Sequence, residues 1–205
     1  MKTKIFISTI LFFLLTSGAF AQTNKGTFVL SGNTNLNFLF SNTSVGTDSI
    51  QTGKIKDNQF AFSAAAGYFV IDNLSAGVSA TYSYDYTSTS LPGSVGIITR
   101  SFTIMPQLNY YLPVNGNLKP FVGIAAGYLW QEEQDSWISE NQNKAFSISG
   151  VSLATGAGAS YFINQSISFD LGFQYFHNRL KDKLTPGFIR KQNAVAGTLG
   201  VSVYF

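Results

Sequence analysis

The chain has 205 residues and a formal net charge of +3, with 45% hydrophobic, 15% aromatic and only 11% charged residues and no cysteine. Average soluble domains carry about 25% charged residues, and disordered chains need low hydrophobicity with high charge, so this composition excludes an intrinsically disordered protein. The absence of cysteine excludes a disulfide scaffold, a cysteine-ligated zinc or iron–sulfur site, and a lipid anchor on an N-terminal cysteine.

The N-terminus has the pattern of a secretory signal peptide. Two lysines among the first four residues precede an apolar run, Ile5–Leu15, and an Ala-Phe-Ala tripeptide ends at Ala21. The run is short against the roughly 20 apolar residues that a spanning helix needs. We therefore predict a signal peptide over residues 1–21, cleavage between Ala21 and Gln22, and a single domain over residues 22–205. Because two positive charges leave with the signal peptide, the high isoelectric point does not indicate nucleic-acid binding.

Apolar residues then recur at every second position in eight segments. In the first half these are Phe28, Leu30, Leu36, Phe38 and Phe40; Phe60, Phe62, Ala64, Ala66, Tyr68 and Val70; Leu74, Ala76, Val78, Ala80, Tyr82, Tyr84 and Tyr86; and Phe102, Ile104, Leu108, Tyr110 and Leu112. In the second half they are Val122, Ile124, Ala126, Tyr128 and Trp130; Val151, Leu153, Ala157, Ala159, Tyr161 and Ile163; Ile167, Phe169, Leu171, Phe173 and Tyr175; and Val195, Leu199, Val201, Val203 and Phe205. Such alternation predicts strands with one apolar face. The phase of the fifth segment stays open, because its alternate positions are Gly and Ala.

The alternate positions of these segments carry small polar residues and almost no charge. A water-facing surface is expected to have roughly 25–35% charged residues. We therefore predict that lipid covers the apolar face and that the polar face lines a lumen, as in transmembrane barrels. A soluble periplasmic β-sandwich is the alternative. The polar residues predicted to line the lumen are Asn33, Asn35, Asn37, Gln107, Asn109, Asp170 and Gln174.

The connections between the segments alternate in length. Those at 71–73, 113–119 and 164–166 are short, whereas those at 41–58, 87–99, 131–144 and 177–192 are long and contain most of the charged residues. Outer-membrane barrels have short periplasmic turns and longer extracellular loops. We therefore predict an all-β fold: a single transmembrane antiparallel up-and-down β-barrel of eight strands, with both termini in the periplasm. Aromatic residues at the segment ends predict two interfacial girdles, and Phe121 is placed in the inner one.

Two motifs carry a family resemblance. They are Pro120-Phe121-Val122-Gly123 with Gly127-Tyr128, and the terminal Leu199-x-Val201-x-Val203-x-Phe205. With them the chain resembles the small eight-stranded outer-membrane barrels of Gram-negative bacteria, the outer membrane protein beta-barrel domain or porin-family type. The resemblance implies that Leu199, Val201, Val203 and Phe205 signal to the barrel-assembly machinery, and that outer-membrane lipid, including lipopolysaccharide, surrounds the protein.

Three positions raise the question of chemistry. His177 is the sole histidine of the chain. Barrel enzymes that deacylate lipid A have a Ser two residues after such a His, but position 179 is Arg in this sequence. We therefore expect His177 to form hydrogen bonds at the rim of the barrel and not to act in catalysis. Asp170 is predicted deep in the lumen, either bonded to hydroxyl groups or on a proton or cation path. Arg100 and Asp85 have opposite phase, so Arg100 is expected to face lipopolysaccharide phosphate unless a bulge restores a salt bridge.

The sequence contains no catalytic, cofactor-binding or metal-ligating motif, and no basic patch interleaved with aromatics that would indicate nucleic-acid binding. The first hypothesis is a non-enzymatic structural or surface-interaction protein that meets an extracellular ligand through its loops, with a lumen largely filled by side chains. The alternative is a narrow porin-like channel, and a lipid-modifying enzyme ranks third. The channel is supported by small lumenal residues, namely Ser63, Ala65, Gly67, Gly77, Ser79, Gly172 and Gly200.

Overall fold

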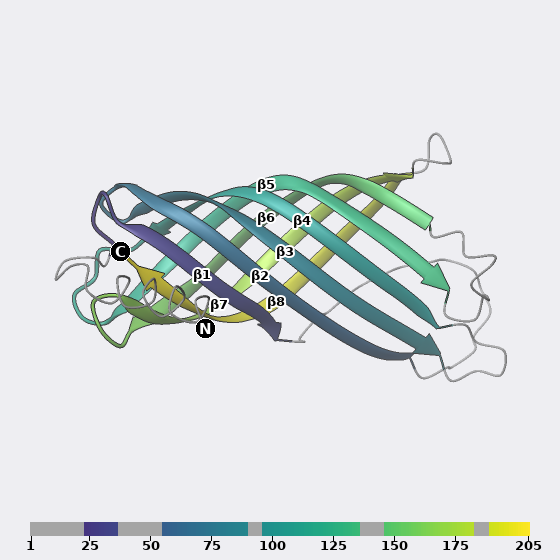
Figure 1. Ribbon diagram of the computed structural model, residues 1–205, viewed down its shortest axis with the longest axis horizontal. Coiled ribbons are helices and arrows are strands. Elements are labelled where there is room, and N and C mark those ends of the chain that lie inside the picture. Colours follow the sequence, from purple (N-terminus) through teal and green to yellow (C-terminus); the bar gives the residue numbers. More distant parts are fainter. Residues whose placement is uncertain (1–22, 37–54, 90–95, 136–145, 183–188) are drawn as a thin grey trace, which may run out of the picture.

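Every strand pairs with the next strand in sequence, and the last pairs with the first. The computed structural model describes residues 23–36, 55–89, 96–135, 146–182 and 189–205. The strands are β1 (Phe28–Leu36), β2 (Ile55–Ile71), β3 (Leu74–Thr89), β4 (Ile97–Tyr111), β5 (Leu118–Asp135), β6 (Phe146–Phe162), β7 (Ile167–Asp182) and β8 (Ile189–Tyr204). All pairs are antiparallel and the sheet closes into a barrel, which confirms the predicted fold (Figure 1). The described residues contain no helix that is long and apolar enough to cross a membrane.

The two ends of the barrel differ. One end, here called the turn end, holds the three tight connections at 72–73, 112–117 and 163–166, together with Thr23 and Phe205 (Figure 1). There the amide groups of Phe28 and Phe205 each donate to the other residue's carbonyl oxygen, at 3.0 and 2.9 Å, and so close the ladder between β1 and β8. At the other end, here called the loop end, β3, β5 and β7 stop at Thr89, Asp135 and Asp182, whereas the described part of β1 ends at Leu36, opposite Gly197 in the middle of β8. The predicted cleavage site at Ala21 and Gln22 lies outside the described residues.

The strands run further toward the loop end than predicted. Glu132, Glu133, Arg179, Lys181 and Arg190 were expected in loops, but they lie on β5, β7 and β8. Hydropathy marks the part of a strand that lipid covers, whereas the backbone ladder continues for as long as two strands can exchange hydrogen bonds. The predicted bounds of all four long connections were therefore too wide, because strand pairing extends to Ile55, Thr89, Ile97, Asp135, Asp182 and Ile189.

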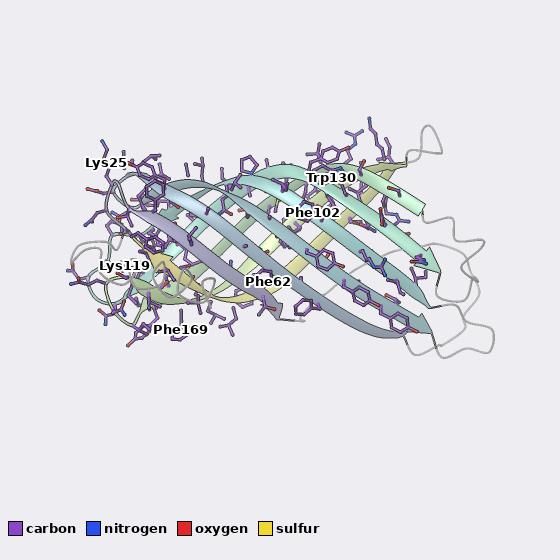
Figure 2. The ribbon with its side chains drawn as sticks, in the orientation of Figure 1. Lys25, Phe62, Phe102, Lys119, Trp130 and Phe169 are labelled. Atoms are coloured by element: carbon purple, nitrogen blue, oxygen red, sulfur yellow. The ribbon has the colours of Figure 1, made fainter. Side chains whose placement is uncertain are left out.

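The apolar alternate residues face outward on every strand. Phe62 is 50% exposed and Phe169 is 51% exposed, and Figure 2 shows both on the outside of the wall. The fifth strand has the same phase, because Val122 and Ile124 are 50% and 61% exposed. An apolar surface that surrounds the barrel in this way fits lipid and not water.

Several inward positions are small because neighbouring strands approach closely there. A Cβ atom on Gly77 would lie 2.7 Å from the Cα atom of Gly67 on β2. A Cβ atom on Gly127 would lie 2.7 Å from the Cα atom of Met105 on β4. These glycines therefore allow the wall to curve. Their small size does not by itself indicate an open path through the lumen.

Candidate functional site

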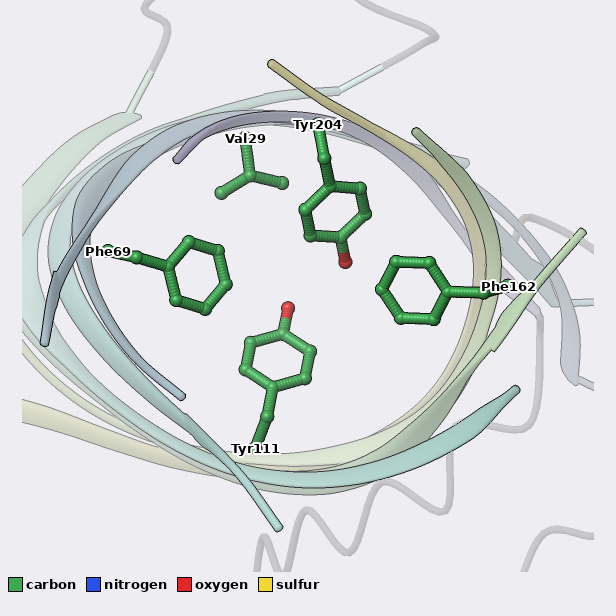
Figure 3. Close-up of a cluster of buried hydrophobic side chains, with 5 residues drawn as sticks. All are labelled: Val29, Phe69, Tyr111, Phe162 and Tyr204. Atoms are coloured by element: carbon green, nitrogen blue, oxygen red, sulfur yellow. The ribbon is translucent and has the colours of Figure 1, made fainter. Parts of the chain in front are cut away.

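A layer of large side chains crosses the lumen at the turn end. Figure 3 shows Val29, Phe69, Tyr111, Phe162 and Tyr204 projecting inward from the wall. They come from β1, β2, β4, β6 and β8 and are at most 7% exposed. We call these five residues the aromatic layer.

The rings of the aromatic layer are in contact with one another. The centroid of Phe69 lies 5.5 Å from that of Tyr111 and 6.2 Å from that of Tyr204, and the centroids of Phe162 and Tyr204 are 4.9 Å apart. Of the three remaining strands, β3 and β7 contribute the small buried residues Ser75 and Ser168 near this level. Alternation of large and small side chains is a common way to fill a small barrel. The result is a packed layer of side chains across the lumen.

Phe121 belongs with this layer and not with the lipid-facing girdle. It packs against the buried cluster, with its ring centroid 5.5 Å from that of Tyr111. A Cβ atom on Gly158 would lie 2.7 Å from Cζ of Phe121, so glycine at that position leaves room for the ring. The girdle assignment was wrong because Phe121 has the opposite phase to Val122, which is the lipid-facing residue.

Above the aromatic layer the lumen holds a polar cavity of about 100 Å³. That volume is enough for several water molecules. The lining includes five of the residues assigned to the lumen from sequence: Asn33, Gln107, Asn109, Asp170 and Gln174. The side chain of Asn35 and the whole of Asn37 lie outside what the structure describes.

Asp170 is held by hydroxyl groups. The Oγ atom of Ser168 donates to Oδ1 of Asp170 at 2.8 Å, and the hydroxyl of Ser202 donates to Oδ2. The hydroxyl of Ser202 also lies 2.7 Å from that of Ser31 on β1. Hydrogen bonds of this kind offset the desolvation of a lumenal carboxylate, as the hydroxyl-bonded interpretation requires. The chain of hydroxyls continues from Ser168 to Tyr204, at 3.5 Å, and so ends in the aromatic layer.

The loop end of the lumen is crossed by an ion pair. The carboxylate of Glu133 on β5 and the guanidinium of Arg190 on β8 meet through two hydrogen bonds, although β6 and β7 separate their strands in the sheet. Gln131 supports Glu133 with a hydrogen bond of 2.8 Å. Below the pair, the inward residues Leu129, Ile148 and Leu180 form a small apolar cluster. The side chains of the ion pair are 31% and 21% exposed, so water reaches this end.

The remaining candidates from the sequence lie on the wall. His177 faces outward, and its Nδ1 atom forms a hydrogen bond of 2.7 Å with Oδ1 of Asn193 on β8. Arg100 is outward and exposed, in the opposite phase to Asp85, and it lies directly opposite Glu132 on β5. Among the residues that the structure describes, no three His, Asp or Glu side chains gather into a group able to hold a metal ion.

Comparison with known proteins identifies the family. A family model described as "Outer membrane protein beta-barrel domain" matches residues 7–205, which is nearly the whole chain. This chain belongs to that family. It is therefore an outer-membrane β-barrel, as the lipid-facing apolar surface indicates. A search of curated protein sequences gave no match.

Solved structures show the same fold. Neisserial surface protein A (NspA) is 16% identical, with a TM-score of 0.56, over 88% of this chain and 98% of that one. OprG from Pseudomonas aeruginosa is 15% identical, with a TM-score of 0.54, over 90% and 98% of the two chains. The outer membrane protein AlkL, solved in lipid bilayers, is 16% identical, with a TM-score of 0.53, over 93% of each chain. Identities this low establish the architecture alone.

Proposed function

We propose that this outer-membrane barrel is closed to solutes and acts through its loop end, which faces the outside of the cell, while the turn end and both termini face the periplasm. The aromatic layer carries the proposal, because it places five nearly inaccessible side chains across the lumen. An interior filled in this way leaves the surface at the loop end as the part able to meet a ligand. Short periplasmic turns and longer outer loops are the usual arrangement of such barrels.

Conductance in a planar bilayer tests closure. The refolded mature protein should give no steps above the empty-bilayer baseline, and a gel shift between unheated and boiled samples shows that it is folded. A double variant, Phe69→Ala with Phe162→Ala, should conduct, because water reaches the ion pair at the loop end and the apolar cluster below it comes from three adjoining strands on one side of the lumen. The matched control, Phe169→Ala with Phe173→Ala, changes two outward residues and should stay silent. Reproducible steps from the wild-type protein would refute closure.

Single cysteines test the orientation, because the chain has no cysteine of its own. Ile97 is 41% exposed at the loop end, and Lys25 lies at the turn end (Figure 2). In intact cells, a membrane-impermeant maleimide should label Ile97→Cys and spare Lys25→Cys, whereas both should react after lysis. The reverse pattern would show that the loop end faces the periplasm.

The polar cavity supports one alternative function, a narrow channel for small solutes or ions. The conductance experiment decides between the two. An enzymatic role is not part of the proposal, since His177 faces outward and bonds to Asn193 with Arg179 two residues away. Accordingly, His177→Ala should leave lipid A acylation unchanged in cells; a change in acylation would bring the enzymatic role back.

A further inference from the structure

Three cations gather on the outward face of the barrel at the loop end. Arg179 and Lys181 on β7 and Lys191 on β8 are all exposed. Arg179 lies directly opposite Lys191, and Lys181 occupies the next outward position on β7. We call these three residues the basic patch. Directly opposed residues on antiparallel strands have Cβ atoms about 4.5–5.5 Å apart and diagonal neighbours are about 7–8 Å apart, so one small anion can meet all three.

No acidic side chain balances the basic patch among the outward-facing residues described on β6, β7 and β8. Its outward neighbours on β6 and β8 are Ser149, Val151, Ile189 and Asn193. Like charges directly opposite each other on paired strands are destabilising. A bound anion would convert this repulsion into attraction.

Arg100 provides a contrast within the same rim. It also faces outward near the loop end, but Glu132 lies directly opposite it on β5. Inside the barrel, Arg190 is likewise matched by Glu133. The rim therefore pairs opposite charges on β4 and β5 and gathers like charges on β7 and β8.

The basic patch lies just beyond the apolar belt. On the same two strands Tyr175 and Val195 are outward, opposite each other, and 43% and 42% exposed. With a strand rise of about 3.3 Å per residue and a tilt of about 40°, Arg179 lies roughly 10 Å further along the barrel axis than Tyr175. Between these levels, the hydroxyl of Tyr175 donates to Oδ1 of Asn193 at 3.0 Å, which ties β7 to β8. The cations therefore stand at headgroup depth above a surface that holds acyl chains.

We propose that the basic patch binds the phosphate of a phosphorylated glycolipid in the outer leaflet. A guanidinium binds phosphate through two parallel hydrogen bonds, and lysines add point charges. A lipid fits better than a soluble anion, because the cations project sideways from the wall directly above the apolar belt and not into the medium. The proposal rests on the orientation given above, in which the loop end faces outward.

Binding of purified lipid A to the folded protein in non-ionic detergent tests the proposal. The wild-type protein should bind bis-phosphorylated lipid A and lose affinity as salt rises. Each cation near an anionic lipid surface is worth roughly a fivefold change, so Arg179→Gln, Lys181→Gln and Lys191→Gln together should weaken binding about 100-fold. The matched control, Arg100→Gln, removes an outward cation that faces a carboxylate and should change affinity less than about twofold.

Three results would overturn the proposal: equal affinity of the triple variant, equal affinity of the wild-type protein for dephosphorylated lipid A, or full competition by inorganic phosphate at an equal concentration. The gel shift on heating shows whether the triple variant is folded, and the single variants provide the measurement if it is not. Binding in detergent does not depend on which end faces outward. A failure of the orientation would therefore appear in the cysteine labelling and leave this measurement unaffected.

Discussion

The two ends of the lumen are crossed by different kinds of side chain. The turn end is crossed by the aromatic layer, in which Phe69 and Tyr204 are completely inaccessible. The loop end is crossed by the ion pair of Glu133 and Arg190, whose side chains remain 21–31% exposed. The aromatic layer consists of packed apolar side chains, whereas the ion pair consists of charged groups that water still reaches.

This difference suggests that one end of the lumen stabilises the barrel and that the other end is the part that water reaches. Buried aromatic rings contribute apolar burial and ring contacts together, and they hold β2, β4, β6 and β8 around one point. An ion pair that water reaches contributes less to stability than buried packing, because water and salt screen it. We therefore expect substitutions in the aromatic layer to lower the free energy of unfolding strongly and substitutions at the loop end to lower it little. Variants at each end test that expectation.

Removal of a ring from the aromatic layer should have the largest effect. Phe69→Ala deletes a fully buried ring and leaves a cavity, so we expect a loss of about 3–5 kcal/mol in the free energy of unfolding. The measurement is urea unfolding in lipid vesicles, followed by tryptophan fluorescence. The outward Phe169→Ala is the matched control and should lose only the transfer of its ring to lipid, about 2 kcal/mol. Equal losses in the two variants would contradict a packed layer.

The sequence predicted the wall of the barrel better than its interior. Period-2 alternation predicted all eight strands because lipid selects apolar residues on one face, and exposure shows that Val122 and Ile124 face lipid, a phase that the sequence left open. The aromatic layer was missed, because Phe69 and Phe162 interrupt the alternation next to a turn and look like ordinary apolar residues. A signal was present: Phe69 stands between Tyr68 and Val70, so three large residues follow one another, and only two of them can face lipid.

Overpacking the aromatic layer should have the next largest effect. A Cβ atom on Gly158 would clash with the carbonyl oxygen of Leu171 and lie 2.7 Å from Cζ of Phe121 and 2.9 Å from the Cα atom of Gly172. Gly158→Val should therefore cost about 1–3 kcal/mol and slow refolding into vesicles, as judged by the gel shift on heating. Gly32→Ala, where an added Cβ meets nothing within 4 Å, is the control and should refold normally. Normal refolding of Gly158→Val would show that both the ring of Phe121 and the backbone of β7 can move aside.

Substitution of Asp170, in the polar middle of the lumen, should lower the free energy of unfolding less than the changes in the aromatic layer. Asp170→Ala removes the acceptor for Ser168 and Ser202. Two hydroxyls then lose a partner, but the adjoining cavity admits water, so we expect a loss of about 1 kcal/mol, the low end for unsatisfied buried groups. Asp170→Asn keeps an oxygen acceptor and should lose less in the same urea experiment. A loss above that of Phe69→Ala would show that Asp170, and not the aromatic layer, is the main support of the interior.

The smallest effect on stability is expected at the ion pair of the loop end. Glu133→Gln removes one charge of a pair that is 21–31% exposed, so the free energy of unfolding should fall by less than about 1 kcal/mol, and by less still in high salt. The double variant Glu133→Gln with Arg190→Gln should lose no more than either single variant, because no unpaired charge remains. The same urea titrations at low and high salt measure both effects. A salt-independent loss of several kcal/mol would mean that the pair is desolvated, and the loop end would then be as tightly closed as the turn end.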